Sequence, residues 1–252
     1  MQNYVGVVTK AGAPGRALHL FMASFVVWWI LLALFNQFPG IDLAVTDSVF
    51  SEANCTVLTR LEKSCGAFPL DRGTFFPAVR NILYMVPYFA VVFMLGALAY
   101  ARWERGLAWK TERTESVIAA LLSLALGCGV IVNLFLKTFS GRPRPRDTLF
   151  FGGDLDFVQA GSFAGKCLKN CSFISGEASS AGWLFCLILL LPERWRLPVG
   201  VPLAVVSIVT PVLRVLMGAH YLSDVVLGWL SSVVVFAGML AVFEAMRRPA
   251  AT

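Results

Sequence analysis

Long runs of apolar residues dominate the pattern of this chain. Six such stretches occur, at about residues 17–38, 81–101, 115–136, 173–192, 197–216 and 221–243. Each is close to the ~20 residues that an α-helix needs to cross a hydrocarbon core about 30 Å thick. The pattern therefore predicts an all-α, polytopic membrane protein, built as a bundle of six transmembrane helices.

Composition favours the same class of protein. Hydrophobic residues make up 58% of the 252 residues and charged residues 14%, against about 45–50% apolar and about 25% charged in soluble domains. With so much of the chain in spans, we expect a single integral-membrane domain over residues 1–252. A cleaved signal peptide is the alternative for the first span, but its apolar run is longer than the usual core of about 7–15 residues. No A-x-A-like cleavage site follows before Phe38-Pro39.

Basic residues in the short connections indicate how the bundle is oriented. If six helices alternate, one side carries Lys10, Arg16, Arg102, Arg105, Lys110, Arg113, Arg194, Arg196, Arg247 and Arg248. The positive-inside rule makes that side cytoplasmic, together with both termini. Two long loops, about 39–80 and 138–172, then face outward. For a bacterial inner membrane this is the periplasmic side, where we expect the active site.

Four cysteines fall in the two outward loops, which is the oxidising side of the membrane. We predict the disulfides Cys55–Cys65 and Cys167–Cys171, each within its own loop. Free thiols are the alternative. Zinc binding is less favoured, because the chain contains no Cys-x2-Cys pair.

Three polar segments occur at the same predicted end of the spans. They are Lys137-Thr-Phe-Ser-Gly-Arg-Pro-Arg144-Pro145, then Ser175-Gly176-Glu177, then Arg214-Val-Leu-Met-Gly-Ala-His220-Tyr-Leu-Ser-Asp224. Cations bind phosphate oxygens, a histidine can attack phosphorus, and a carboxylate can orient that histidine. The segments together indicate phosphate chemistry at one membrane surface.

These segments resemble the signature of the type 2 phosphatidic acid phosphatase superfamily of membrane lipid phosphatases, K-x6-RP, (P)SGH and (S)R-x5-H-x3-D. The first and third elements match in residue type and spacing, except that Leu213 replaces the usual serine. The second element differs, with Ile174 in place of proline and Glu177 in place of histidine.

The resemblance implies that His220 is the nucleophile and becomes transiently phosphorylated. Asp224 lies four residues later, so on a helix that begins near Tyr221 the two side chains can share a face. A carboxylate there can accept the proton of one ring nitrogen and leave the other free to attack. Taken alone, a His-x3-Asp pair is more often an ordinary surface pair. The upstream Arg214 and Lys137 favour the catalytic interpretation.

The predicted phosphate-binding residues are Lys137, Arg144, Arg214, Ser175 and Gly176. The three cations would neutralise the phosphoryl oxygens, and this effect is largest in the transition state. Ser175 and Gly176 begin a predicted helix, whose free N–H groups suit a phosphate oxygen. A plain serine cap followed by glycine is the alternative for this pair.

Two further arginines, Arg142 and Arg146, alternate with prolines in the first segment. We expect them to contact the headgroup of the substrate. The alternative is a basic juxtamembrane stretch attracted to anionic lipids.

Glu177 replaces the histidine that the family is proposed to use as a proton donor to the leaving oxygen. Three interpretations stay open. Glu177 is a general acid whose pKa is raised by burial, or the leaving group needs no acid, or Glu177 is a structural partner of an arginine.

The sequence therefore favours a phosphoric monoester hydrolase acting on an outward-facing membrane lipid, with the bilayer as its surroundings and no nucleic-acid partner. No metal or other cofactor is expected, because three side-chain cations take the place of Mg²⁺. Ser-Gly-Glu resembles the bacterial lipid A phosphatases of the superfamily. Prenyl diphosphate, phosphatidylglycerophosphate and phosphatidate are alternative substrates, and a lipid phosphotransferase is an alternative activity. A transporter or non-catalytic binding protein is less favoured, because the charges cluster at one membrane face instead of the midplane.

Overall fold

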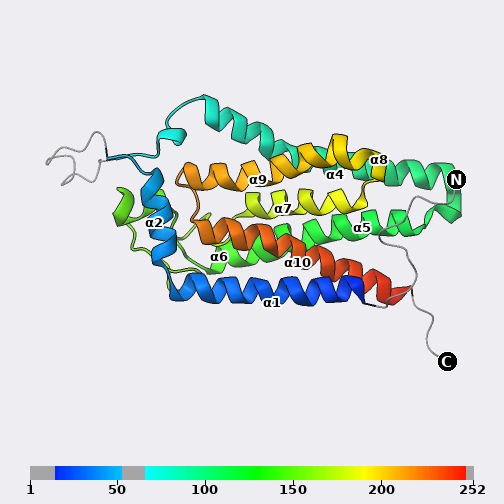
Figure 1. The fold of residues 1–252 in the computed structure, drawn as a ribbon, viewed down its shortest axis with the longest axis horizontal. Coiled ribbons are helices and arrows are strands. Elements are labelled where there is room, and N and C mark those ends of the chain that lie inside the picture. Colours follow the sequence, from blue (N-terminus) through cyan, green and yellow to red (C-terminus); the bar gives the residue numbers. More distant parts are fainter. Residues whose placement is uncertain (1–14, 53–65, 248–252) are drawn as a thin grey trace.

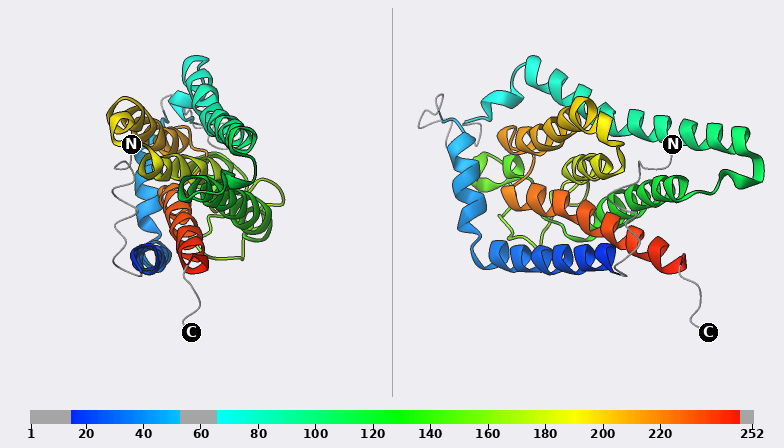
Figure 2. Two further views of the ribbon diagram at one scale, coloured as in Figure 1. Left: turned by 90° about the vertical axis from the view of Figure 1, so that its right-hand side faces the viewer. Right: turned by 45° about the vertical axis from the view of Figure 1, so that its right-hand side comes forward.

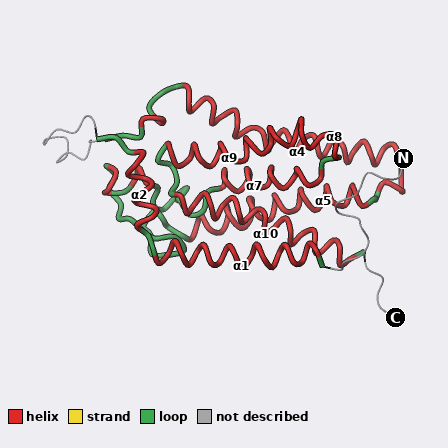
Figure 3. Tube along the Cα trace, viewed as in Figure 1, coloured by secondary structure: helices red, strands yellow, loops and turns green. Residues whose placement is uncertain are grey.

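The structure of the protein, a computed structural model, describes residues 15–52 and 66–247. Within these two ranges the chain consists of helices and loops, with no β-strand (Figure 3). The longer elements are α1 (Arg16–Gln37), α2 (Gly40–Val49), α4 (Phe75–Arg105), α5 (Glu112–Leu124), the π-helical η3 (Ala125–Leu136), α7 (Gly176–Leu187), α9 (Val201–Leu216) and α10 (Leu222–Met246). Short elements are η1 (Pro69–Asp71), η2 (Gly106–Trp109), α6 (Lys137–Phe139), η4 (Pro145–Asp147), η5 (Leu149–Phe151), η6 (Ile188–Leu190), α8 (Glu193–Trp195) and η7 (Arg196–Gly200). The all-α membrane fold predicted from the apolar runs is confirmed.

Five helical stretches among the described residues are long and apolar enough to cross a membrane. They are Arg16–Gln37, Phe75–Arg105, Glu112–Phe139, Glu193–Leu216 and Leu222–Met246. The stretch predicted at 173–192 forms a shorter apolar helix, Gly176–Leu190. This helix is short because the hydroxyl of Ser175 caps its first turn, while Pro192 follows its end.

The long helices run side by side along one axis, and α7 lies among them (Figure 1). Its Trp183 is buried and donates its indole N–H to the carbonyl of Ala120 in α5 at 2.7 Å. Small residues allow α7 to approach its neighbours closely. A Cβ on Gly182 would lie 2.3 Å from the carbonyl oxygen of Trp229 in α10. Small residues at helix contacts are typical of membrane bundles, where close backbone packing replaces the hydrophobic effect.

The outer helices leave large apolar side chains on the surface. Ile30 of α1 is 60% exposed, and Phe93 and Trp103 of α4 are 77% and 83% exposed. Exposed apolar area of this extent does not suit water, whereas it suits the hydrocarbon interior of a bilayer. The exposed faces of α1 and α4 are therefore lipid-facing surfaces.

The two ends of the bundle differ in content. One end holds the start of α1, the α4–α5 connection, α8 and the end of α10 (Figures 1 and 2). Arg247 there pairs with Glu115 at 2.6 Å. The opposite end holds α2, the loop between α6 and α7, and the α9–α10 turn. The second end is therefore where the three polar segments meet.

The helix α2 is not predicted by the apolar pattern, which indicates a loop over about residues 39–80. Its Ile41, Leu43 and Val45 pack against three separate apolar clusters at this end. Ten residues are too few for a span or for a clear periodic pattern. The packing of these side chains, and not the intrinsic pattern, defines this helix.

Candidate functional site

A cavity of about 920 Å³ lies between α4, η3, α7 and α9. All three polar segments contribute to its lining, through Lys137, Arg144, Gly176, Glu177, Arg214 and His220. Arg80 of α4 and Arg146 line it as well. Residues as far apart in sequence as Arg80 and His220 thus meet at one site.

His220 lies in the tight turn between α9 and α10. Gly218 adopts φ +60° in this turn, and a Cβ there would lie 2.3 Å from ring atoms of Phe68. Only glycine fits both conditions. The N–H groups of Ala219 and His220 both donate to the carbonyl of Arg214, at 3.0 and 3.2 Å. The turn therefore fixes the histidine relative to the arginine at the end of α9.

The ring of His220 is held by Ser172 more directly than by Asp224. Its Nδ1 lies 2.9 Å from the carbonyl oxygen of Ser172 and 3.8 Å from Oδ2 of Asp224. The hydroxyl of Ser172 in turn donates to Oδ2 of Asp224 at 2.5 Å. We expected the carboxylate to take the ring proton itself. In the structure it acts one step further away, because a backbone carbonyl occupies the nearest position.

Burial lowers the pKa of His220 to about 4, against the opposing influence of Asp224. The imidazole is therefore neutral near pH 7. With Nδ1–H directed at a carbonyl, Nε2 keeps its lone pair. This is the protonation state that a nucleophilic histidine requires.

Arg144 is fixed by the loop that precedes α7. Its Nε donates to the carbonyl of Asn170 at 3.0 Å, and its Nη2 donates to Oδ1 of Asn170 at 2.8 Å. Burial and the neighbouring Arg146 lower the pKa of Arg144, but a guanidinium stays protonated in proteins. The cavity therefore contains a rigidly held positive charge.

Lys137 and Arg214 are the other two predicted phosphate-binding cations that line the cavity. Within the described residues, Nε of Arg214 is buried and has no hydrogen-bond partner. Arg214 is nearly buried, and its nearest counter-charge is Oε1 of Glu177 at 3.5 Å. A buried cation without a full set of partners is costly. An anionic ligand in the cavity would supply the missing partners.

Ser175 and Gly176 have different roles in the structure. The Ser175 hydroxyl accepts a hydrogen bond from the N–H of Ala178 at 3.3 Å, and the residue is fully buried. Its side chain therefore caps α7 and does not line the cavity. This differs from the prediction that Ser175 contacts phosphate. Gly176 does line the cavity. A Cβ on it would lie 2.5 Å from Oδ1 of Asn133, so a larger residue would require the Asn133 side chain to move.

Glu177 is engaged by two arginines. Its Oε2 accepts from Nε of Arg80 at 2.9 Å, and its Oε1 accepts from Nη2 of the same arginine. Arg214 lies on the other side, as described above. A carboxylate held by two guanidinium groups is favoured in its ionised form, which has no proton to give. The arrangement favours the structural interpretation of Glu177 over the general acid.

Arg142 is not available to a headgroup, contrary to the sequence-based expectation. It is fully buried and pairs with Asp42 at 2.7 Å and Asp224 at 2.6 Å. It also donates to the carbonyl of Val158 at 2.7 Å and lies 4.3 Å over the ring of Tyr221. Because all of its polar atoms face the protein interior, neither headgroup binding nor attraction to the bilayer surface applies to it.

Arg146 remains compatible with the expected role. It lines the cavity, its side chain is 41% exposed, and it pairs with Asp71 at 3.3 Å.

Four residues of the site are not predicted by the sequence, namely Asp42, Arg80, Asn170 and Ser172. Asp42 lies in α2 and Arg80 in α4, whereas Asn170 and Ser172 lie in the loop before α7. Nothing in the spacing of these four residues distinguishes them from ordinary polar residues. Their role depends on contacts between distant segments.

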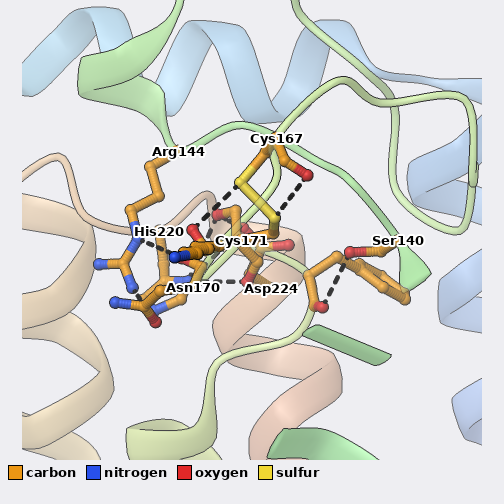
Figure 4. The surroundings of a disulfide bond; sticks show 10 residues. Ser140, Arg144, Cys167, Asn170, Cys171, His220 and Asp224 are labelled. Carbon is orange, nitrogen blue, oxygen red and sulfur yellow. Dashed lines mark hydrogen bonds and ion pairs between the residues drawn. A yellow bond between two sulfur atoms is a disulfide. The ribbon is translucent and has the colours of Figure 1, made fainter. Parts of the chain in front are cut away.

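The structure contains the disulfide Cys167–Cys171, with the Cα atoms 5.7 Å apart (Figure 4). It lies directly beside Asn170 and Ser172. The other predicted disulfide, Cys55–Cys65, lies outside the described residues.

Comparison with known proteins identifies the family. The model of the PAP2 superfamily matches residues 116–248. A lipid A 4'-phosphatase from Rhizobium leguminosarum is 46% identical over 226 residues, covering 90% of this chain and 97% of the relative. One from Rhizobium etli is 44% identical, covering 93% of this chain and 91% of the relative, and one from Francisella tularensis subsp. novicida is 32% identical, covering 81% and 86%. The chain therefore belongs to the PAP2 superfamily.

A solved structure agrees with this at the level of the fold. The crystal structure of a transmembrane PAP2-type phosphatidylglycerolphosphate phosphatase from Bacillus subtilis covers 91% of this chain and 98% of its own, with a TM-score of 0.55 and 17% identity. The chain is thus a multi-pass membrane protein and a lipid phosphatase of the PAP2 type, a phosphoric monoester hydrolase, as predicted from its three polar segments.

Proposed function

We propose that this protein hydrolyses a phosphate monoester of a lipid A-type glycolipid in the outer leaflet of a bacterial inner membrane. The reaction proceeds through a phosphohistidine on His220. The convergence of a neutral histidine with Lys137, Arg144 and Arg214 in one cavity is the main support. The choice of lipid rests on the relatives, which are lipid A 4'-phosphatases.

In the first step the lone pair of Nε2 forms a bond to phosphorus as the bond from phosphorus to the lipid oxygen breaks. The three cations neutralise the phosphoryl oxygens, whose charge develops in the transition state. The ring becomes positively charged as the N–P bond forms. Asp224 lies 3.8 Å from Nδ1 and stabilises that charge through space.

In the second step a water molecule attacks phosphorus and the N–P bond breaks, which returns the neutral histidine and releases phosphate. The departing lipid oxygen of the first step needs a proton. Since Glu177 is held by Arg80 and Arg214, we infer that this proton comes from water in the cavity. Charge neutralisation is supplied by side chains, so no metal or cofactor is assigned a step.

The proposed orientation places the cavity on the periplasmic side, with both termini in the cytoplasm. Its support is the basic end of the bundle, which holds the start of α1, the α4–α5 connection, α8 and the end of α10. We also propose Gly176–Leu190 as a sixth span, surrounded by the five longer ones. The whole chain then forms one membrane domain. Reporter fusions after Arg105 and after Gly152 test the topology, with signals expected on opposite sides.

The substrate is tested by phosphate release in detergent from lipid A, prenyl diphosphate, phosphatidate and phosphatidylglycerophosphate. We expect lipid A to be preferred, with mass spectra showing loss of one phosphate. His220→Ala is the matched control, because it removes the nucleophile and few packing contacts. Rapid acid-free quenching with labelled substrate should trap a phosphohistidine in the wild type. Full activity of a folded His220→Ala variant would rule out this mechanism.

The same assay separates hydrolysis from transfer. Adding a second lipid as acceptor leaves the product as free phosphate if water is the acceptor, and gives a phosphorylated lipid if the protein is a phosphotransferase.

A further inference from the structure

The loop that the disulfide Cys167–Cys171 closes contacts two different parts of the site. Asn170 lies inside this loop and binds Arg144 through its carbonyl and its side chain. Ser172 comes directly after the loop, and its carbonyl lies 2.9 Å from Nδ1 of His220. The loop thus reaches both a phosphate-binding arginine and the proposed nucleophile.

We propose that this disulfide-closed loop is the positioning element of the site. Its Ser172 carbonyl selects the tautomer of His220, and its Asn170 sets the direction of the Arg144 guanidinium. The proposal rests on the phosphohistidine function proposed above. It adds two positioning residues that the polar segments do not contain, and it makes turnover depend on an intact disulfide.

The selection of the tautomer follows from the atom that faces Nδ1. A carbonyl oxygen only accepts, so Nδ1 must carry the proton, and Nε2 is then the free nucleophile. A hydroxyl can donate as well as accept, so it would not select one tautomer. The loop is well suited to this role, because the N–H of Ser172 donates to the carbonyl of Arg142 at 2.7 Å and its hydroxyl donates to Asp224. The carbonyl has little room to turn.

The backbone of the loop is held by a hydrogen bond and by the disulfide. Asn170 has φ +52°, a left-handed conformation that asparagine tolerates better than most residues. The N–H of Cys167 donates to the carbonyl of Gly141 at 2.9 Å, which ties the start of the loop to the first polar segment. With Cys171 linked to Cys167, both ends of the loop are fixed on either side of Asn170 (Figure 4). Opening the link would free the two contacts together.

The direct test is the tautomer of His220, read from ¹⁵N chemical shifts of histidine-labelled protein in detergent. His19→Gln leaves His220 as the single histidine. We expect the Nδ1–H tautomer in this background. Cys167→Ser with Cys171→Ser should give a mixture of tautomers and lower kcat/KM by roughly 10–100-fold, as for the loss of other groups that orient a reacting ligand. An unchanged tautomer, with kcat/KM within about threefold of the parent, would overturn the proposal.

Two single variants separate the contacts. Asn170→Gly keeps the backbone conformation and the carbonyl and removes the side chain with its Oδ1, so we expect lower kcat/KM with the tautomer unchanged. Ser172→Ala keeps the carbonyl, so the Nδ1–H tautomer should persist. A switch of tautomer in Ser172→Ala would show that the carbonyl is not the selecting group.

Reduction of the folded protein covers the case in which the double cysteine variant does not fold. In a Cys55→Ser, Cys65→Ser background, dithiothreitol can open only the Cys167–Cys171 link, and activity should fall and return on reoxidation. Insensitivity to full reduction, checked by thiol labelling, would contradict the proposal. If instead the proposed function of His220 as nucleophile is wrong, the result is different, because the His220→Ala variant then still turns over substrate.

Discussion

Nη2 of Arg142 lies 2.7 Å from Oδ2 of Asp42, a residue one hundred positions earlier in the chain. Both side chains are buried, and Nη1 of the same arginine binds Asp224. The pair joins α2 to the first turn of α10, because Asp42 also accepts the N–H of Ser223 at 2.8 Å. A short helix is in this way connected to Asp224, the carboxylate that lies 3.8 Å from Nδ1 of His220.

Arg142→Ala should unfold more easily than the wild type, by about 3–5 kcal/mol, because two buried carboxylates lose their common counter-charge. Activity should fall too, since Asp224 loses its strongest partner. Thermal unfolding in detergent and phosphate release measure the two effects. Arg146→Ala is the matched control from the same loop. Its exposed pair with Asp71 should be worth about 0–1 kcal/mol. Equal destabilisation by the two variants would contradict the buried network.

The pH dependence should show that His220 stays neutral well below pH 6. Its pKa is lowered to about 4 by burial, so protonation removes the nucleophile only as the pH falls through that value. An ordinary histidine would already be lost near pH 6.5. A ¹⁵N titration of His220 in the His19→Gln background measures this without substrate. The second ionisation of the substrate phosphate, near pH 6, therefore does not interfere. A midpoint above about pH 6 would contradict the expectation.

The class of fold could be predicted from the sequence because each membrane span is a separate long run of apolar residues. Runs of apolar residues of about the right length must become helices in a bilayer, where every backbone group needs an internal partner. The length of the helix Gly176–Leu190 was overestimated, because it was also predicted from an apolar run. Its apolar run includes Phe173 and Ile174, which are buried in the loop before the Ser175 cap. Apolar composition does not distinguish a lipid-facing helix from buried loop residues.

The site was accessible in part. The spacing of the motifs predicted that His220, Arg144 and Arg214 lie at one site, because their segments follow the ends of helices on the same side of the membrane. The residues that orient them were not accessible, because Ser172, Asn170 and Asp42 act through contacts between distant segments. Arg142 shows the limit of composition in the other direction. A basic residue next to a proline in a loop suggests a surface contact, and only the fold shows that two carboxylates surround Arg142.

Gly218→Ala should lower both stability and turnover. The alanine would have to adopt φ +60°, and its Cβ would overlap the ring of Phe68. Strain of this kind costs of order 1–3 kcal/mol, and relief of the overlap would displace His220. Gly96→Ala is the control, because a Cβ there meets nothing within 4 Å and its helix α4 should gain slightly in stability. Unfolding temperature and kcat compare the two. Wild-type kcat in Gly218→Ala would show that the turn does not position the histidine.

Glu177→Gln tests whether this residue holds arginines or donates a proton. If it holds Arg80 and Arg214, the variant should slow an alkyl phosphate and an activated aryl phosphate by the same factor. The guanidinium groups would lose their anchor with both substrates. Arg80→Gln should have a similar effect, and the double variant should be little worse than either single one, because the two residues act as a unit.

A general acid would give another pattern. The alkyl phosphate would slow by about 10²–10⁴-fold, and the aryl phosphate, whose leaving group departs unprotonated, would hardly change. Both rates are measured on one preparation, so differences in folded fraction cancel in their ratio. Because both oxygens of Glu177 accept hydrogen bonds from Arg80, we expect the ratio to stay near that of the wild type. A ratio changed by more than about tenfold would instead assign the proton to Glu177 and require its ion pair to open during turnover.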